Sequence, residues 1–293
     1  MLGVLLLGLL SAHVVADEQI DWLMLDNGKI QVGLDPDRGA CIGWLALAED
    51  GKNWLNHYDT GRFIQQSYYG DADGSDWNGR PWVYNPVQGG SWDDTPAEVV
   101  SLIQRPESLY AKIIPRHWAK PDQLCPEASM ELWVTLRGFT VDVRMRMMYT
   151  GPNHKEAKHQ ELPAVFVDAS LDTLVFYEGE APWTGDALTR IEPGWPNEYG
   201  ASTEHWLSYV NPDNFGVGVF SPGVSEFTCY RYLPENAADT SAACSYFAPI
   251  RTFALETGSV VDYHMFLTLG PLDQIRARFD EARQAMPEPN LFP

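Results

Sequence analysis

Hydrophobic and polar residues alternate along many short segments of this chain. A period of two places the apolar side chains on one face of an extended strand, which is typical of strands that are buried on one side only. The clearest segments are Ile30, Val32 and Leu34; Leu132, Val134 and Leu136; Val141, Val143, Met145 and Met147; and Val261, Tyr263, Met265 and Leu267. We therefore expect an all-β fold.

Two local signals refine this expectation. Gly138 lies between two alternating segments and can adopt a positive φ, so Arg137 to Thr140 is predicted to close a β-hairpin. Residues 271–286 instead place Leu272, Ile275 and Phe279 at helical spacing, with Pro271 suited to a first turn. This segment is the one helix that the pattern predicts, at the carboxyl end of an otherwise β chain.

One region is polar and aromatic where a core strand would be apolar. The residues from Tyr58 to Gly70 and from Asn85 to Gly90 combine guanidinium, amide and phenol groups, which suit sugar hydroxyls. If the chain is extended here, Arg62, Gln66 and Tyr68 face one side and Gln65 and Tyr69 the other. We expect Tyr68 or Tyr69 to stack on substrate or to shuttle a proton. The candidate substrate-binding residues are Arg62, Gln65, Gln66, Tyr69, Asn85 and Gln88.

Two further segments carry groups for acid-base chemistry. His159 and Glu161 project from the same face of an extended chain, and a carboxyl in an aromatic cleft can donate a proton near neutral pH. Glu204 could supply a second catalytic carboxylate and Trp206 a stacking platform for a sugar. For each of these groups a structural role is the alternative.

The aspartates Asp71, Asp73 and Asp76 resemble the first half of a calcium loop. Position 82, where the bidentate glutamate would stand, is a tryptophan. We expect no cofactor, and calcium at these aspartates is the alternative.

The charge and aromatic content narrow the class of partner. Forty acidic residues against 20 basic ones give a formal net charge of −20, which disfavours nucleic acids and anionic membranes. Aromatic residues make up 12% of the chain and include 11 tryptophans, whose flat rings pack against sugar rings. A carbohydrate partner is expected, and the oligomeric state is left open.

The amino terminus predicts export. Residues 1–16 contain an apolar run followed by small residues, which indicates a signal peptide, so residues 17–293 would form a single secreted or periplasmic domain. An oxidising compartment favours disulfides, and we expect two. Three connectivities are possible, and we favour the pairs that are closer in sequence, Cys41–Cys125 and Cys229–Cys244.

Several phrases resemble the galactose mutarotase-like superfamily. They are residues 27–32, Arg38-Gly39-Ala40, residues 51–56, residues 159–165, Tyr177-Glu178-Gly179 before Pro182-Trp183, Glu204-His205-Trp206, and residues 216–219. The resemblance implies a β-supersandwich with one carboxyl-terminal helix. Domains of this superfamily include hydrolases, lyases, epimerases and non-catalytic modules, so it indicates fold more than reaction.

The leading hypothesis is a secreted enzyme that cleaves glycosidic bonds by hydrolysis. A polysaccharide lyase would use Tyr or His as the base and Arg or Asn to neutralise a uronate. An aldose 1-epimerase would need a His acid and a Glu base. A non-catalytic carbohydrate-binding module would keep the aromatics and lose little if Glu161 were neutralised.

Overall fold

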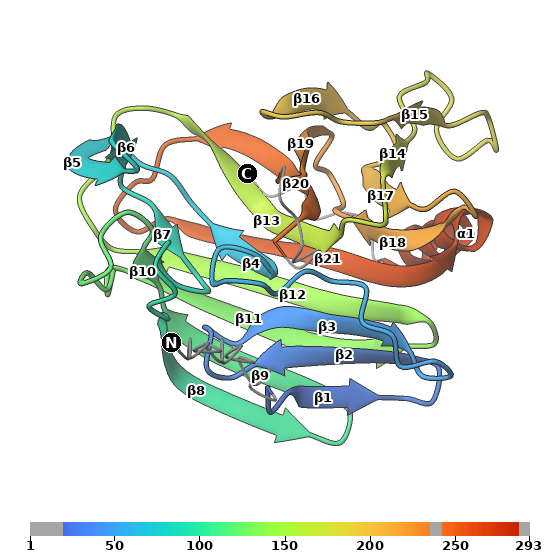
Figure 1. The fold of residues 1–293 in the computed structure, drawn as a ribbon, viewed down its shortest axis with the longest axis horizontal. Coiled ribbons are helices and arrows are strands. Elements are labelled where there is room, and N and C mark those ends of the chain that lie inside the picture. Colours follow the sequence, from blue (N-terminus) through green and yellow to red (C-terminus); the bar gives the residue numbers. More distant parts are fainter. Residues whose placement is uncertain (1–19, 235–241, 287–293) are drawn as a thin grey trace, which may run out of the picture.

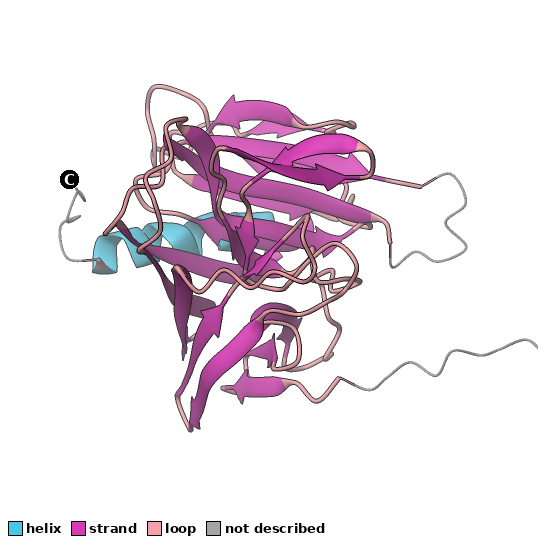
Figure 2. Ribbon diagram, turned by 90° about the vertical axis from the view of Figure 1, so that its left-hand side faces the viewer, coloured by secondary structure: helices cyan, strands magenta, loops and turns pink. Residues whose placement is uncertain are grey.

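The structure is a computed structural model that describes residues 20–234 and 242–286. The predicted signal peptide over residues 1–16 lies outside the described residues. Within the described ranges, the helix that forms has neither the length nor the apolar content to cross a membrane. The fold is mostly β, with antiparallel sheets and one helix near the carboxyl end, as the residue pattern predicts (Figures 1 and 2).

In the described part of the chain, ten strands form one sheet, here called the site sheet. Its main path runs, in spatial order, through β1 (Leu23–Asp26), β2 (Ile30–Asp35), β3 (Cys41–Leu47), β4 (Ile64–Ser67), β13 (Lys158–Asp168), β20 (Cys244–Phe253), β19 (Glu226–Tyr232) and β16 (Glu198–Ala201). The short strands β7 (Pro86–Val87) and β10 (Arg116–His117) extend from β4.

A second sheet, the backing sheet, has nine strands among the described residues. Its spatial order is β15 (Thr189–Ile191), β14 (Thr173–Phe176), β17 (Trp206–Val210), β18 (Phe215–Phe220), β21 (Val260–Pro271), β12 (Thr140–Tyr149), β11 (Ala128–Arg137), β9 (Ser108–Ile114) and β8 (Glu98–Arg105). A separate hairpin consists of β5 (Ala72–Trp77) and β6 (Arg80–Val83). The predicted hairpin is confirmed, because Arg137 pairs with Thr140 where β11 turns into β12.

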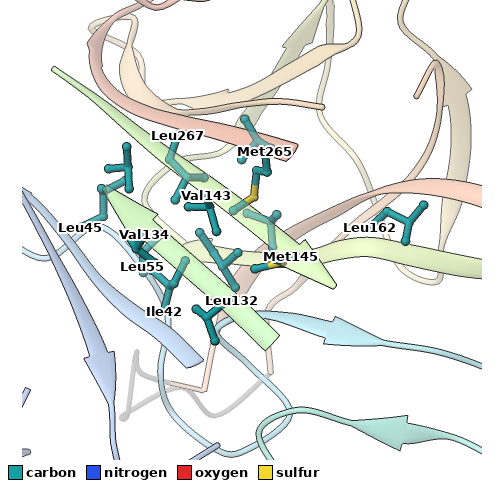
Figure 3. Close-up of a cluster of buried hydrophobic side chains, with 14 of the residues drawn as sticks. Ile42, Leu45, Leu55, Leu132, Val134, Val143, Met145, Leu162, Met265 and Leu267 are labelled. Atoms are coloured by element: carbon teal, nitrogen blue, oxygen red, sulfur yellow. The ribbon is translucent and has the colours of Figure 1, made fainter. Parts of the chain in front are cut away.

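The main core lies between the two sheets. Along β12 buried and half-buried residues alternate without a break, so every second side chain enters this core. Figure 3 shows part of this core, where side chains from β3, β11, β12, β13 and β21 meet around Leu55. Burial of one apolar face on each sheet is what holds a sandwich of this kind together.

Helix α1 (Leu272–Ala285) covers the opposite face of one end of the backing sheet. Ile275 and Phe279 are fully buried there against Trp206, Phe220 and Phe266. The predicted helix is therefore confirmed, with its apolar stripe turned toward β17, β18 and β21.

The prediction of two disulfides is wrong for this structure. Cys41, Cys125, Cys229 and Cys244 are all buried free thiols. Cys229 belongs to the main core, whereas Cys244 lies in an apolar cluster on the outer face of the site sheet. The backbone of the sheet separates these two side chains, although β19 and β20 are neighbours.

Candidate functional site

A pocket of about 540 Å³ opens on the outer face of the site sheet. Its size falls within the range of small-molecule sites. In Figure 1 the hairpin of β5 and β6 lies at the left, β16 lies above β19 and β20, and β13 runs beneath. The pocket is lined by Asp59, Gly61, Arg62, Gln65, Ser67, Tyr69, Trp77, Asn78, Trp82, Asn85, Val87, Trp92, Trp118, Glu161, Ala164, Phe166, Trp195, Asn197, Tyr230, Tyr232 and Tyr246.

An irregularity in β13 shapes the floor of this pocket. The pairing of β13 with both neighbours shifts register after Glu161 and resumes at Ala164 or Val165. The extra residue changes which positions face outward, so Glu161, Ala164 and Phe166 all line the pocket. In a regular strand, Glu161 and Phe166 would point to opposite faces.

Glu161 is half-buried on this floor and is surrounded by hydroxyl groups. Tyr246 donates a hydrogen bond to Glu161 Oε1 at 2.5 Å, and the hydroxyls of Ser67 and Tyr69 also bond the carboxylate. Burial raises the pKa of Glu161, and the three hydroxyls oppose that rise without cancelling it. A carboxyl in this environment can hold a proton and release it to a bound substrate.

Tryptophans form one wall of the pocket. Trp77 and Trp82 lie on the hairpin of β5 and β6, with ring centroids 5.1 Å apart, and Trp77 also meets Trp118 edge-on at 5.7 Å. Asp73 of the hairpin anchors this wall, because its carboxylate contacts His117 Nε2 at 2.9 Å and Lys120 Nζ at 2.6 Å.

The other wall is built from tyrosines of the site sheet and one tryptophan. Tyr230 stacks on Tyr246 at 4.4 Å, and Trp195 packs on Tyr230 at 4.8 Å and on Tyr232 at 5.4 Å. Trp195 is 61% exposed, so much of its surface remains open to a ligand. Two aromatic walls above a polar floor suit a ring with apolar faces and hydroxyl edges.

A charged pair lies beside the floor. Arg62 forms an ion pair with Asp59 and donates from Nη2 to the carbonyl of Ala242 at 3.2 Å. Both residues line the pocket, which thus contains two carboxyl groups, Glu161 and Asp59. Arg62 points into the pocket because the chain turns at Phe63, whose φ of 87° ends the period-two alternation that begins in β4.

Five of the predicted site residues line the pocket: Arg62, Gln65, Tyr69, Asn85 and Glu161. Two of them are occupied in holding the backbone. Gln65 donates to the carbonyls of Thr60 and Arg62, and Asn85 donates to the carbonyl of Tyr68. These hydrogen bonds hold the backbone at the edge of the pocket and occupy amide groups that a substrate could otherwise bind.

Three predicted residues face away from the pocket. Tyr68 is fully buried in the main core, and its hydroxyl donates to Gln66 Oε1. Gln66 donates to the carbonyl of Glu131, and Gln88 donates to the carbonyl of Gly39. The structure places these residues away from the expected substrate contacts, because each is fully buried and hydrogen-bonded within the protein.

Glu204 and Trp206 also differ from expectation. Glu204 is fully buried, and its carboxylate accepts hydrogen bonds from Arg276 of α1, from Trp206 Nε1 at 2.7 Å and from the backbone of Trp183 at 2.6 Å. Neither Glu204 nor Trp206 lines the pocket. Glu204 links α1 to the interior of the protein through Arg276, so the structure places it away from the pocket where a catalytic carboxylate is expected.

His159 lies on β13 but does not line the pocket. It is exposed, with Nδ1 hydrogen-bonded to the hydroxyl of Thr252 at 2.8 Å and its ring 5.5 Å from that of Tyr199. None of the described histidines is among the lining residues. His159 therefore lies outside the pocket that Glu161 lines.

The aspartates of the possible calcium loop have other partners. Asp71 accepts from the backbone of Lys155 and Glu156, Asp73 binds His117 and Lys120, and Asp76 accepts from Gly79. Across residues 20–234 and 242–286, no group of three or more His, Cys, Asp or Glu side chains is placed to hold a metal ion.

Sequence reasoning missed several lining residues. Tyr230 and Tyr232 are spaced by two along β19, a signal that could have placed them on one face, whereas Tyr246 is the single tyrosine of β20. Asp59 lies inside the polar-aromatic run, but nothing in its local pattern marks it as a pocket residue. Asn197 and Trp195 come from an irregular segment, where no period predicts which way a side chain points.

Solved structures identify the fold. A putative aldose 1-epimerase from Escherichia coli K12 is similar over 85% of this chain and 98% of its own, with a TM-score of 0.55 and 13% identity. A galactose mutarotase-like protein from Lactobacillus casei covers 85% of this chain and 99% of its own, with a TM-score of 0.53 and 12% identity. This chain has the galactose mutarotase-like fold.

The same fold is found as part of a larger enzyme. A 4-alpha-glucanotransferase from Thermococcus litoralis is similar over 86% of this chain and 38% of its own, with a TM-score of 0.50 and 11% identity. No protein-family model matches the sequence, and a search of curated proteins finds no match. At these sequence identities, the similar structures show the fold of this chain but not its reaction. The reaction has to be inferred from the residues of the pocket.

Proposed function

We propose that the protein is an exported carbohydrate-active enzyme that hydrolyses a glycosidic bond in the aromatic pocket. One observation carries the proposal: Glu161, a carboxyl with a raised pKa, lies on the floor of an aromatic-walled pocket that a second carboxyl, Asp59, also lines. Paired carboxyl groups of different environment are what glycoside hydrolysis usually requires. Two of the similar structures are described as a putative aldose 1-epimerase and a 4-alpha-glucanotransferase, which supports a carbohydrate substrate.

In the proposed reaction Glu161 donates its proton to the glycosidic oxygen as the bond to the anomeric carbon breaks. Asp59, which forms an ion pair with Arg62, can stabilise the positive charge that develops on the sugar and accept the proton that the attacking water loses. The water hydroxyl ends on the anomeric carbon, and the leaving sugar carries the proton from Glu161.

The position of the histidines favours a hydrolase over an epimerase. An epimerase of the expected kind would use a His acid with a Glu base, and His159 stands outside the pocket. Asp59, in contrast, is inside it, which supplies the second carboxyl that hydrolysis needs.

The test compares the wild type with Glu161→Gln on a panel of neutral and uronate oligo- and polysaccharides. We expect new reducing ends without ultraviolet absorbance of unsaturated sugars, and a loss of about 100-fold or more in Glu161→Gln, because a positioned proton donor contributes at least that much. Glu107→Gln, at an exposed turn between β8 and β9, is the matched control and should keep full activity.

Other outcomes would replace the proposal. Reducing ends that appear together with ultraviolet absorbance would indicate a lyase. Anomer exchange of a monosaccharide, followed by nuclear magnetic resonance, would indicate an epimerase. Binding without turnover would indicate a carbohydrate-binding module, and equal activity in Glu161→Gln would remove Glu161 from the chemistry.

A further inference from the structure

The outer face of the site sheet continues beyond the pocket along β13. His159 precedes Glu161 by two residues, before the irregularity, so both side chains lie on the same face. Two residues of a strand span about 7 Å. His159 therefore lies immediately beyond the edge of the pocket floor.

Tyr199 reaches the same place from another strand. The strands β20 and β19 separate β16 from β13 in the sheet, yet the rings of Tyr199 and His159 are 5.5 Å apart with an interplanar angle of 42°. The segment before Tyr199 contributes Trp195 and Asn197 to the pocket. The Tyr199–His159 pair is thus connected to the pocket both along β13 and through the segment that leads into β16.

This pair has the composition of a sugar platform. Tyr199 is 63% exposed and belongs to none of the hydrophobic clusters among the described residues. Single exposed aromatics are common on protein surfaces and need no explanation. Here the ring adjoins a pocket, and hydroxyl and amide groups accompany it: Thr252 is hydrogen-bonded to His159, and Asn197 donates to the hydroxyl of Thr228 at 3.0 Å.

We propose that Tyr199 and His159 form a second sugar-binding subsite, so the substrate is an oligosaccharide with at least two units and not a free monosaccharide. One unit occupies the pocket above Glu161, and the neighbouring unit lies on the Tyr199 ring with its hydroxyls near His159 and Thr252. This inference rests on the proposed function of the pocket. It gives His159 a binding role in place of the proton transfer expected from the sequence.

The test measures saccharide binding by calorimetry in the Glu161→Gln background, which prevents turnover during the measurement. The probes are neutral mono-, di- and trisaccharides of glucose, galactose and mannose. The background protein should bind the best trisaccharide more tightly than its monosaccharide. Adding Tyr199→Ala should weaken the trisaccharide about tenfold, equal to about 1.4 kcal/mol, and the monosaccharide less than twofold.

Matched variants separate a subsite from a general disturbance. Tyr199→Phe keeps the ring and should retain the preference for longer saccharides. Phe139→Ala, an exposed aromatic at the turn between β11 and β12, should change neither affinity. His159→Ala, introduced in the otherwise wild-type enzyme, should raise KM for the trisaccharide while kcat stays near that of the wild type.

The outcomes distinguish this inference from the proposed function. Equal affinity for mono- and trisaccharide, or an equal loss for both in Tyr199→Ala, would overturn the subsite and leave the pocket as a sugar site. A collapse of kcat in His159→Ala would return His159 to the chemistry and overturn its binding role. Binding of none of the saccharides would overturn the proposed function and the subsite with it.

Discussion

The surroundings of each residue decide its role more than its type does. Glu161 and Glu204 are both glutamates with different surroundings. Hydroxyl groups surround the carboxylate of Glu161, whereas the carboxylate of Glu204 forms an ion pair with Arg276. Tyr68 and Tyr69 are neighbours in sequence, yet one is in the main core and the other lines the pocket. Chemistry is therefore expected where a carboxyl keeps a raised pKa beside open space.

The pH dependence of the enzyme should report the hydroxyls around Glu161. Glu161 acts as an acid only when protonated, so activity should fall as pH rises through its pKa. The Tyr246 hydroxyl favours the ionised form, which lowers the pKa of Glu161 against the larger effect of burial. Tyr246→Phe should therefore raise this pKa and move the alkaline limb of the pH-rate profile to higher pH.

The control for this prediction is Tyr110→Phe. Tyr110 also donates to a carboxylate, that of Glu131 at 2.6 Å, but it lies on the backing sheet. Its removal should leave the alkaline limb in place. A limb that stays fixed or moves to lower pH in Tyr246→Phe would show that Glu161 is not the titrating acid.

At the scale of elements, the hairpin of β5 and β6 depends on its anchors. A two-stranded hairpin alone is marginally stable in water, and this one pairs with no third strand in the described part of the chain. Its contacts to the rest of the molecule include Asp73 with His117 and Lys120, and Trp77 with Trp118. The hairpin forms one wall of the pocket, and contacts with residues outside the hairpin largely hold it in position.

Asp73→Asn should loosen this wall and weaken saccharide binding by about three- to tenfold, because it removes a partly buried charge-assisted contact of about 1 kcal/mol. Burial opposes ionisation of Asp73, but hydrogen bonds from Lys120 and Ser75 outweigh it and hold the pKa of the carboxyl well below its usual range. The anchor is thus complete near neutral pH and is lost only as pH falls through that lowered pKa.

Calorimetric titration of the best saccharide at neutral pH checks this expectation. Asp122→Asn, an exposed aspartate near the same loop, is the matched control and should bind as the wild type does. Unchanged affinity in Asp73→Asn would mean that the tryptophan contacts alone position the hairpin.

On the scale of the whole molecule, stability comes from apolar packing between the sheets and not from covalent links. Burial raises the pKa of Cys125 and Cys229 to about 12, so these thiols stay protonated and unreactive near neutral pH. Thiol titration should therefore find four reactive groups in the denatured, unreduced protein and far fewer in the native one.

The same titration has a clear contrary result. Zero or two thiols in the denatured protein would restore the disulfides that the cysteine count predicts. The unfolding midpoint should also be unaffected by a reductant, since no cross-link is present to break.

Much of the fold followed from the residue pattern, and less of the site did. The alternation in β12, the turn at Gly138 and the helix after Pro271 are local properties, and the structure confirms each of them. The alternation of Gln65, Ser67 and Tyr69 toward the pocket was also predictable. Arg62 was placed on the wrong face, because the positive φ at Phe63 interrupts the period.

The rest depends on contacts between distant segments. Nothing local distinguishes Glu161 from Glu204, since their burial is set by β20 in one case and by α1 in the other. The irregularity after Glu161 shifts the outward positions of β13 by one, which a period of two cannot foresee. Strand order, which brings Tyr199 to His159, is likewise a property of the assembled sheet.

The two walls of the pocket come from different parts of the chain. The residues that would recognise a sugar are therefore largely different from the residues that stabilise the fold. Trp77, Trp82 and Trp92 belong to the chain between β4 and β8, which contributes only Tyr68, Tyr84 and Ala97 to the main core. That stretch could be exchanged for one of another length while the strands that carry Glu161 and Tyr246 keep their partners. New sugar preferences would then be accessible to grafting, and to natural variation, at little risk to the scaffold.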